Sequence, residues 1–379
     1  MFQDTPSNEH VLEEDERFLS EQIITYIGNK RSLLPFIGKG LQFVKSRIGK
    51  ERIECLDLFS GSGVVARYLK AHSERLVAND LELYSRVTNE CFLANRSDVS
   101  EALLAEGLRR IERAALTELM PGFITELYAP KDDSNITEHD RAYYTRRNAA
   151  YIDTVRAAIG REPAELQRYY LGPLLASASV HANTAGVFKG FYKNEHGIGQ
   201  FGGSGRDALT RILKPIKLEL PRFSRFESYV QVFQEDANVL VRQLRGERFD
   251  VAYLDPPYNQ RPYGSHYFML NLIAANKRPA VVSRVSGIPE DWNRSSYNRK
   301  PEAEEVLFDA IECCPAKFVL ISYGSEGFIS PSSFADRLNR LGNVITLKMP
   351  HNTFGGRRNL AGRSIHVTEF LYLLEKPDG

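Results

Sequence analysis

The segment 53–80 constrains the fold of this 379-residue chain more than any other. Residues 53–59 are mostly apolar and predict a buried strand, and Ser60-Gly61-Ser62-Gly63 follows as a glycine-rich turn. Residues 64–69 then predict a helix, and residues 75–80 predict a second strand that ends in an acid. A strand, a glycine loop, a helix and a strand with a terminal acid, all within about thirty residues, indicate the start of a doubly wound α/β fold.

The rest of the chain interrupts this pattern and then resumes it. Residues 84 to about 170 have the periodicity of long amphipathic helices, and residues 182–221 are glycine-rich and loop-like. Strand signals return at 229–233, 249–254, 318–323, 344–348 and 368–374. The last two of these are expected to form a terminal antiparallel pair. We therefore predict a Rossmann-like α/β sheet, mostly parallel with a terminal antiparallel strand, that is interrupted by a helical, loop-rich insertion.

The composition excludes several classes of protein. The chain is 42% hydrophobic and 26% charged with a net charge of +1, which predicts a globular protein whose nucleic-acid site, if present, is a local basic patch. The four cysteines, Cys55, Cys91, Cys313 and Cys314, have no CxxC spacing, so neither a metal site nor a disulfide framework is expected. We recognise no signal peptide and no membrane span, and we expect a cytoplasmic protein.

The sequence Asp255-Pro256-Pro257-Tyr258 follows the apolar run 249–254. The prolines fix the backbone and lack N–H donors, which leaves nearby carbonyls free to accept hydrogen bonds. The carboxylate also accepts, and the tyrosine ring offers a flat surface for stacking. Together these groups suit an amino group on a planar heterocycle. The alternative is an ordinary proline-rich turn after a strand.

The glycine loop and Asp80 predict a nucleoside-bearing ligand beside this amine. Glycine lets the backbone approach a ligand closely, and Asp80 is placed either to accept ribose hydroxyls or to cap a helix. The loop lacks the third glycine of a dinucleotide site, since position 66 is Ala66, which disfavours an NAD-dependent oxidoreductase. A nucleoside cofactor next to an amino heterocycle indicates S-adenosylmethionine and methyl transfer to a base.

These residues resemble those of the DNA adenine-N6 methyltransferases of the Dam-like class, in the alpha motif order. The matching motifs, in order along the chain, are Tyr26-Ile27-Gly28-Asn29-Lys30-Arg31 with Leu33-Leu34, Asp57 to Gly63, Asn79-Asp80, Asp236, Asp255 to Tyr258, and Glu369-Phe370-Leu371. The resemblance implies a set of cofactor-binding residues, namely Tyr26, Lys30, Asp57, Phe59, Gly61, Gly63, Asp80 and Asp236. For Lys30, a surface lysine is the alternative.

The resemblance also implies a mechanism. The target adenine would be flipped out of the duplex and stacked on Tyr258, while Asp255 and the Pro256 carbonyl accept hydrogen bonds from its amine. Transfer would be direct and in line, without a covalent enzyme intermediate and without a metal. The implied domains are a flexible lead (1–21), a catalytic cofactor-binding domain (22–98 and 228–379) and an inserted target-recognition domain (99–227).

Two basic clusters are candidate DNA contacts. The first, in the glycine-rich part of the insertion, comprises Lys189, Lys193 and Arg206, and the second comprises Arg357, Arg358 and Arg363. Each could instead be a solvated face of the protein. The expected partner is double-stranded DNA, and in a restriction–modification system a cognate restriction endonuclease encoded nearby would be a second. The protein is expected to be a monomer without membrane contact.

Several functions compete with a site-specific DNA methyltransferase of a restriction–modification system or an orphan methylase. An RNA adenine-N6 methyltransferase would use the same tetrapeptide, because it recognises the base and not the sugar. Cytosine-N4 enzymes more often have Ser or Thr in place of Asp255, and protein-glutamine methyltransferases more often have Asn. A catalytically silent DNA-binding module would have no need of the intact Asp255 and Tyr258.

Overall fold

A seven-stranded sheet is the frame of the computed structural model, which describes residues 14–206, 208–352 and 366–377. The strand order is β3-β2-β1-β4-β5-β7-β6, and the first five of these are parallel, whereas β7 runs antiparallel to both of its neighbours. The strands are β1 (Ile53–Asp57), β2 (Ser73–Asp80), β3 (Tyr229–Gln234), β4 (Phe249–Leu254), β5 (Ala316–Gly324), β6 (Asn343–Asn352) and β7 (His366–Glu375). The predicted fold class is therefore confirmed, including the terminal antiparallel pair.

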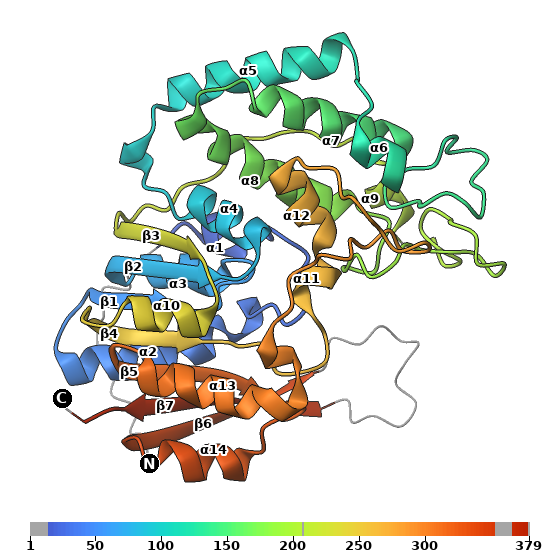
Figure 1. Cartoon of the computed structure of the whole chain (residues 1–379). Coiled ribbons are helices and arrows are strands. Elements are labelled where there is room, and N and C mark those ends of the chain that lie inside the picture. The colour runs from blue at the N-terminus through green and yellow to red at the C-terminus, as the bar shows by residue number, and fades with distance from the viewer. Residues whose placement is uncertain (1–13, 207, 353–365, 378–379) are drawn as a thin grey trace.

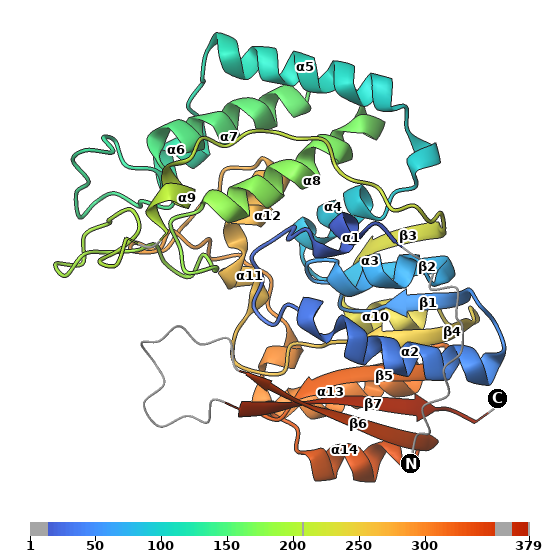
Figure 2. The ribbon, with the colours of Figure 1, turned by 180° about the vertical axis from the view of Figure 1, so that it is seen from behind.

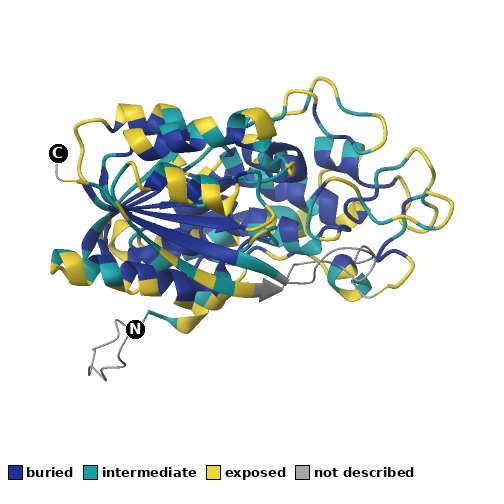
Figure 3. Cartoon of the chain, turned by 90° about the horizontal axis from the view of Figure 1, so that it is seen from below, coloured by how far each residue is buried: buried dark blue, intermediate teal, exposed yellow. Residues whose placement is uncertain are grey.

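The strands are apolar on both faces because helices cover both sides of the sheet (Figure 3). In β4, Val251 and Tyr253 pack toward one side, and Ala252 and Leu254 pack toward the other. The first side carries α2 (Leu34–Ile48) and α3 (Val64–Lys70), which are seen in front of the sheet in Figure 2. The opposite side carries α10 (Ala237–Gln243), α13 (Lys300–Cys313) and α14 (Pro331–Leu338).

A separate layer of helices lies beyond the β3 edge of the sheet (Figure 1). We call it the helical layer; it consists of α5 (Glu101–Thr117), α6 (Phe123–Tyr128), α7 (Arg146–Ile159), α8 (Ala164–His181), α9 (Leu209–Leu213), α11 (Tyr263–His266) and α12 (Phe268–Ala275). Helix α4 (Leu83–Phe92) joins the two parts, since it contacts both β2 and α8.

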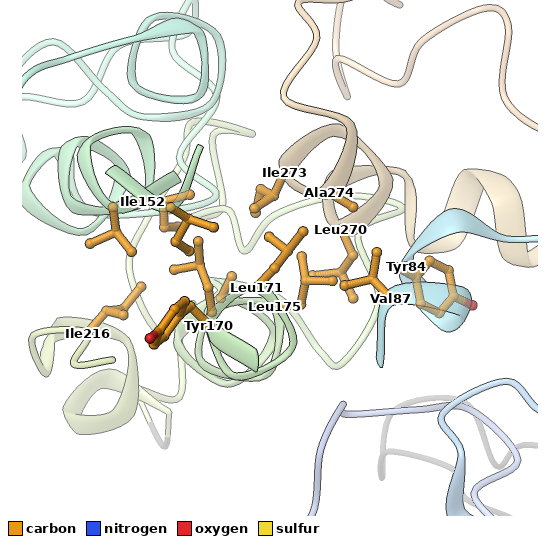
Figure 4. Packing of buried hydrophobic residues seen from close by; sticks show 14 of the residues in the cluster. Tyr84, Val87, Ile152, Tyr170, Leu171, Leu175, Ile216, Leu270, Ile273 and Ala274 are labelled. Atoms are coloured by element: carbon orange, nitrogen blue, oxygen red, sulfur yellow. The ribbon is translucent and has the colours of Figure 1, made fainter. Parts of the chain in front are cut away.

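The core of the helical layer is built from distant parts of the sequence. Leu171 and Leu175 of α8 pack beside Leu270 and Ile273 of α12, and Val87 of α4 completes this group (Figure 4). Residues of α12 come after the tetrapeptide 255–258, so this core extends beyond the predicted insertion 99–227. The helical layer is thus assembled from two stretches of chain, with the tetrapeptide lying between them in sequence.

The amino-terminal helix α1 (Glu16–Ser20) packs against the rest of the protein. Phe18 is buried, and the buried guanidinium of Arg67 on α3 donates hydrogen bonds to the carbonyls of Phe18 and Glu21. The second half of the predicted flexible lead is therefore held in place, while residues 1–13 lie outside the described part. The three short 3-10 helices are η1 (Arg31–Leu33), η2 (Arg96–Asp98) and η3 (Ser296–Asn298). Among the described residues, no helix combines the length and the apolar character that crossing a membrane requires.

Candidate active site

A cavity opens at the carboxyl ends of β1, β2 and β4. It brings together most of the predicted cofactor-binding and catalytic residues, from segments that are far apart along the chain. The predicted residues that line it are Tyr26, Lys30, Asp57, Phe59, Gly61, Asp80, Asp236 and Asp255. Gly63, Pro256 and Tyr258 are next to lining residues. The parallel register explains the grouping, because β1 ends with Asp57 paired to Tyr253 of β4, two residues before Asp255.

The glycine loop after β1 forms one wall of the cavity. Gly61 and Gly63 have φ angles of +51° and +75°, which L side chains rarely adopt. A Cβ on Gly61 would lie 2.8 Å from the Tyr26 hydroxyl, and one on Gly63 would lie 2.7 Å from Oδ1 of Asn89. The loop therefore requires glycine at both positions, and Gly61 lines the cavity.

The carboxylate of Asp80 holds the glycine loop and the chain just before α4. It accepts the N–H of Gly61 at 2.8 Å and the N–H of Glu82, at the start of α4, at 2.9 Å. Burial raises the pKa of Asp80 to about 6, although these backbone hydrogen bonds oppose the shift. Asp80 also lines the cavity, so its carboxylate lies within it as a possible acceptor for a ligand hydroxyl.

Asp57 is a buried acid with unused hydrogen-bonding capacity. Its side chain is 1% exposed, and neither carboxylate oxygen accepts a well-aligned hydrogen bond from the described residues, although the nearby backbone N–H groups of Phe59 and Ala66 act to lower its pKa. Burial, together with the nearby charges of Asp255 and Asp80, raises its pKa well above the ordinary value. A buried acceptor without a partner is costly, so a donor on a ligand in the cavity would satisfy it.

Another wall of the cavity consists of two aromatic rings and an acid that caps a helix. Asp236 caps α10 by accepting the N–H groups of Asn238 and Val239 at 2.9 and 3.2 Å. Phe59 meets Tyr297 edge to face, with ring centroids 5.0 Å apart, and the Tyr297 hydroxyl donates to Oδ1 of Asn238 at 2.6 Å. Phe59, Tyr297 and Asp236 all line the cavity, so this wall places a pair of aromatic rings beside a carboxylate.

Lys30 is buried between two acids, so the alternative of a surface lysine is wrong. Its side chain is 5% exposed, and Nζ lies 3.1 Å from Oδ1 of Asp255 and 3.0 Å from Oε1 of Glu369. Glu369 also accepts a hydrogen bond of 2.7 Å from the Ser322 hydroxyl. Burial lowers the pKa of Lys30, but the two carboxylates outweigh it and hold that pKa well above the ordinary value. Burial raises the pKa of Asp255 to about 6, with Lys30 opposing the shift.

The tetrapeptide presents an acceptor pair and a ring at the rim of the cavity. No described residue donates a hydrogen bond to the carbonyl of Pro256, which leaves it available. The partly buried ring of Tyr258 lies against Tyr323, with centroids 5.4 Å apart, and Lys30 Nζ lies 5.6 Å from the Tyr258 centroid. The three predicted catalytic groups are thus adjacent and are held by the neighbouring strand.

Of the two clusters of predicted DNA contacts, one lies within the described residues and one lies outside them. Lys189, Lys193 and Arg206 are exposed on loops of the helical layer, and Lys193 Nζ lies 5.2 Å from the centroid of Phe191. The second cluster, formed by Arg357, Arg358 and Arg363, lies outside the described residues. Within the described part, no group of three or more His, Cys, Asp or Glu side chains could hold a metal ion.

Sequence reasoning missed several residues of the site. Glu82, Asn293 and Tyr297 line the cavity, and Ser322 supports Glu369 beneath Lys30. Glu82 lies two residues after Asp80, at the end of a predicted strand, so its position in the sequence could have identified it as a residue of the site. Asn293 and Tyr297 belong to an irregular segment without periodicity or motif, and nothing in the sequence places them at the cavity.

The comparisons with known proteins agree with this geometry. A family model of D12 class N6 adenine-specific DNA methyltransferases matches residues 26–285. The chain is 30% identical over 361 residues to the type II methyltransferase M.NlaIII of Neisseria lactamica, which covers 93% of this chain and 99% of that protein. It is 28% identical over 358 residues to the type II methyltransferase M.CviAII of Paramecium bursaria Chlorella virus 1, with the same coverage of 93% and 99%. The modification methylase StsI of Streptococcus sanguinis is 28% identical over 372 residues, which are 93% of this chain and 52% of StsI.

Proposed function

The chain belongs to the D12 class of N6 adenine-specific DNA methyltransferases, and from this membership we propose that its cavity binds S-adenosylmethionine while Asp255, Pro256 and Tyr258 hold the target adenine. The resemblance to adenine-N6 methyltransferases that the motifs indicated is confirmed, and the enzyme acts on DNA. Membership of this family therefore favours adenine in DNA as the substrate over adenine in RNA and over cytosine.

The residues of the cavity fit the proposed cofactor. Asp57 supplies two buried acceptors without partners, which suit a cationic or N–H donor group of the ligand. Gly61 presents backbone where a side chain would not fit, and Asp80 has lone pairs for ribose hydroxyls. The aromatic pair Phe59–Tyr297 beside Asp236 suits contact with the adenine ring and its amine. S-adenosylmethionine, when bound, supplies an electrophilic methyl group on a sulfonium.

The arrangement of Lys30, Asp255 and Pro256 carries the proposed chemistry. The carboxylate of Asp255, fixed by Lys30, and the free carbonyl of Pro256 accept the two N–H bonds of the adenine amine. Acceptors on both hydrogens draw the nitrogen lone pair out of conjugation with the ring and make it available as a nucleophile. Tyr258 stacks on the flipped base and fixes its plane. The protein contributes alignment and fixed charges, and no covalent intermediate is needed.

The test is to separate binding from transfer at Asp255. In Asp255→Ala, transfer of a labelled methyl group to duplex DNA should be lost, while S-adenosylmethionine still binds in calorimetry. Asp336→Ala, an exposed acid on α14, is the control and should keep full activity. If Asp255→Ala retained transfer, Asp255 would have no catalytic role. If the unaltered enzyme labelled structured RNA but no duplex DNA, the assignment of the substrate would fail.

We also propose that the enzyme protects DNA in a restriction–modification system. The supporting observation is that M.NlaIII and M.CviAII, which align with the chain almost from end to end, are type II methyltransferases. A cognate endonuclease encoded nearby would be the partner, and a monomer acting on DNA in the cytoplasm is the proposed form. DNA from cells that express the enzyme should resist that endonuclease, and sedimentation should give the mass of one chain. Cleavage of such DNA would instead favour an orphan methylase.

A further inference from the structure

The segment 281–288, which follows α12, forms a tight exposed turn at the loop end of the helical layer. Val282 and Pro289 form an antiparallel bridge, and the N–H of Ser283 donates to the carbonyl of Ile288 at 2.9 Å. Within the turn, the hydroxyls of Ser283 and Ser286 lie 2.8 Å apart. The turn is outside the insertion 99–227, in which the sequence placed target recognition.

Side chains of the insertion hold this turn by its backbone. Arg141 donates to the carbonyls of Ser283 and Arg284 at 3.3 and 3.2 Å. The hydroxyl of Tyr143 donates to the carbonyl of Ser286 at 2.8 Å, and the hydroxyl of Tyr128 donates to the carbonyl of Gly287 at 2.8 Å; both tyrosines are fully buried. Four backbone carbonyls of the turn are therefore occupied. A turn fixed in this way loses little conformational entropy when a ligand binds to its side chains.

The tip of the turn exposes an arginine next to a valine. Val285 is 56% exposed and Val281 is 55% exposed, although both are β-branched apolar residues, and Arg284 is exposed between them in sequence. The turn therefore presents a planar cationic group and an apolar group at adjacent positions of one element. Such a pair of side chains suits a partner with both polar and apolar groups.

Arg284 and Val285 border a hollow together with the glycine-rich loop of the insertion. Phe191 and Lys193 line it from that loop, and Arg141 lines it from the base. Three cations, Lys193, Arg141 and Arg284, face two carboxylates in this hollow. One of these carboxylates, Asp140, already accepts the hydroxyl of Thr137 at 2.7 Å. The hollow therefore joins the turn to the basic loop that contains Lys189 and Lys193.

The turn lies on the side of the molecule where the active site opens. Figure 1 shows the loops of the helical layer, including the segment after α12, projecting on the same side as α11, to which the catalytic strand β4 leads. Figure 2 shows the same relationship from behind. A duplex whose adenine enters the cavity would therefore pass beneath these loops.

We propose that Arg284 and Val285 read base edges of duplex DNA and help to determine the recognition sequence. This inference rests on the proposed DNA methyltransferase function of the same site. An arginine can form a bidentate contact with O6 and N7 of guanine, and an apolar side chain can contact the methyl group of thymine. The tip thus offers both kinds of major-groove contact from one rigid element, whereas Lys189 and Lys193 supply charge for the phosphates.

The test is to map modified adenines by sequencing DNA from cells that express the enzyme or one of its variants, and to compare the methylated motifs. Arg284→Ala and Val285→Ala should each relax the methylated motif at one position, with the preference at that position falling about tenfold or more. Arg284→Lys keeps the charge but lacks the planar fork, so it should relax the motif as well. Arg340→Ala and Leu116→Ala, which alter exposed side chains elsewhere in the chain, should leave the motif unchanged.

Two outcomes would overturn the inference. One is an unchanged motif in both alanine variants; the other is a motif that Arg284→Lys preserves while Arg284→Ala only weakens DNA binding uniformly, which is the behaviour of a phosphate contact. These outcomes differ from a failure of the proposed function, in which the unaltered enzyme would leave host adenines unmodified. Because the altered side chains are exposed, thermal unfolding should be unchanged and serves as the check on folding.

Discussion

Lys30 Nζ lies 3.1 Å from Oδ1 of Asp255, and this contact joins the amino-terminal motif to the proposed catalytic tetrapeptide. Asp255 would otherwise be a strongly desolvated acid, since burial raises its pKa to about 6 even with the lysine present. A protonated carboxyl has lost part of its acceptor capacity and cannot hold an amine as a carboxylate does. Lys30 therefore keeps Asp255 in the ionised form at neutral pH.

Replacing this cation should move the pH profile of methyl transfer. In the wild type, activity should fall as the pH drops through about 6, because Asp255 becomes protonated there. In Lys30→Met the pKa of Asp255 rises, so the acid limb of single-turnover transfer should move toward neutral pH. The rate at pH 7 should also fall by about 100-fold, because the carboxylate loses its fixed position.

The control for Lys30 is Lys39→Met, which removes an exposed lysine from α2. Its profile should match that of the wild type. If Lys30→Met kept the acid limb at the same pH, Lys30 would not be what keeps Asp255 ionised. A loss of S-adenosylmethionine binding in Lys30→Met, measured separately, would assign the lysine to the cofactor instead.

Neutralising Glu369 should move the same limb in the opposite direction. The charge of Glu369 raises the pKa of Asp255, so Glu369→Gln should lower it and preserve activity to a lower pH than in the wild type. The amide oxygen can still accept from Ser322 and Lys30, so the rate at pH 7 should stay within about tenfold of the wild type. Glu375→Gln, farther along the same strand and paired with Arg47, should leave the profile unchanged. A limb that moved upward in Glu369→Gln would contradict this account of the charges.

Local patterns were sufficient to predict the frame of the catalytic domain. The predicted strand 249–254 coincides with β4, and the glycine loop lies between β1 and α3 as expected. These elements are specified by short-range signals, namely apolar runs, glycines and a terminal acid. Asp57, Asp80 and Asp255 meet because parallel strands place their carboxyl ends at one edge of the sheet.

The parts that could not be predicted depend on long-range contacts. The partner of Lys30 in β7 lies 339 residues away, and only the folded sheet makes this lysine a buried one. The apolar pattern of α12 gives no indication that its partner is α8 rather than the sheet. Asn293 and Tyr297 reach the cavity from an irregular segment, where no period or turn signal fixes the path of the chain.

Glu82 should make the stability of the protein depend on pH. It is 3% exposed, and its Oε2 accepts from Asn271 at 2.6 Å and from Asn293 at 3.1 Å, which ties α12 and the irregular segment to the end of β2. Burial raises its pKa to about 7, with the hydrogen bond from Asn271 opposing the shift. A raised folded-state pKa means that its contribution to stability is complete below the unfolded value of about 4.3 and is lost as the pH rises through about 7.

The variant Glu82→Gln should remove this dependence. Its amide oxygen can accept the same hydrogen bonds but cannot ionise, so the free energy of unfolding should exceed that of the wild type by a few kcal/mol at pH 8 and should match it near pH 4. Chemical denaturation at both values measures the difference. Glu90→Gln, which alters a partly exposed residue of the same helix, is the control. Equal stability of Glu82→Gln and wild type at pH 8 would mean that Glu82 is not costly to ionise.

A Cβ at Gly61 should damage the cofactor site more than it damages the fold. Gly49 and Gly61 both have positive φ angles, +74° and +51°, so alanine at either position should cost about 1 kcal/mol of stability. Gly49 has open space around it, whereas a Cβ on Gly61 would lie 2.8 Å from the hydroxyl and 3.0 Å from Cε1 of Tyr26. Gly61→Ala must therefore displace Tyr26 or the loop whose N–H binds Asp80.

Cofactor affinity, measured by calorimetry, should consequently fall about tenfold or more in Gly61→Ala and stay constant in Gly49→Ala, as expected when a wall of a preformed site moves. Removing the nearest clashing atom in the double variant Gly61→Ala/Tyr26→Phe should recover part of the affinity, but not all, because the ring carbons remain close. If both alanine variants bound S-adenosylmethionine as the wild type does, the glycine loop would not be part of the cofactor site. If both lost affinity equally, backbone strain alone would explain the result, and the contact between Gly61 and Tyr26 would have no part in it.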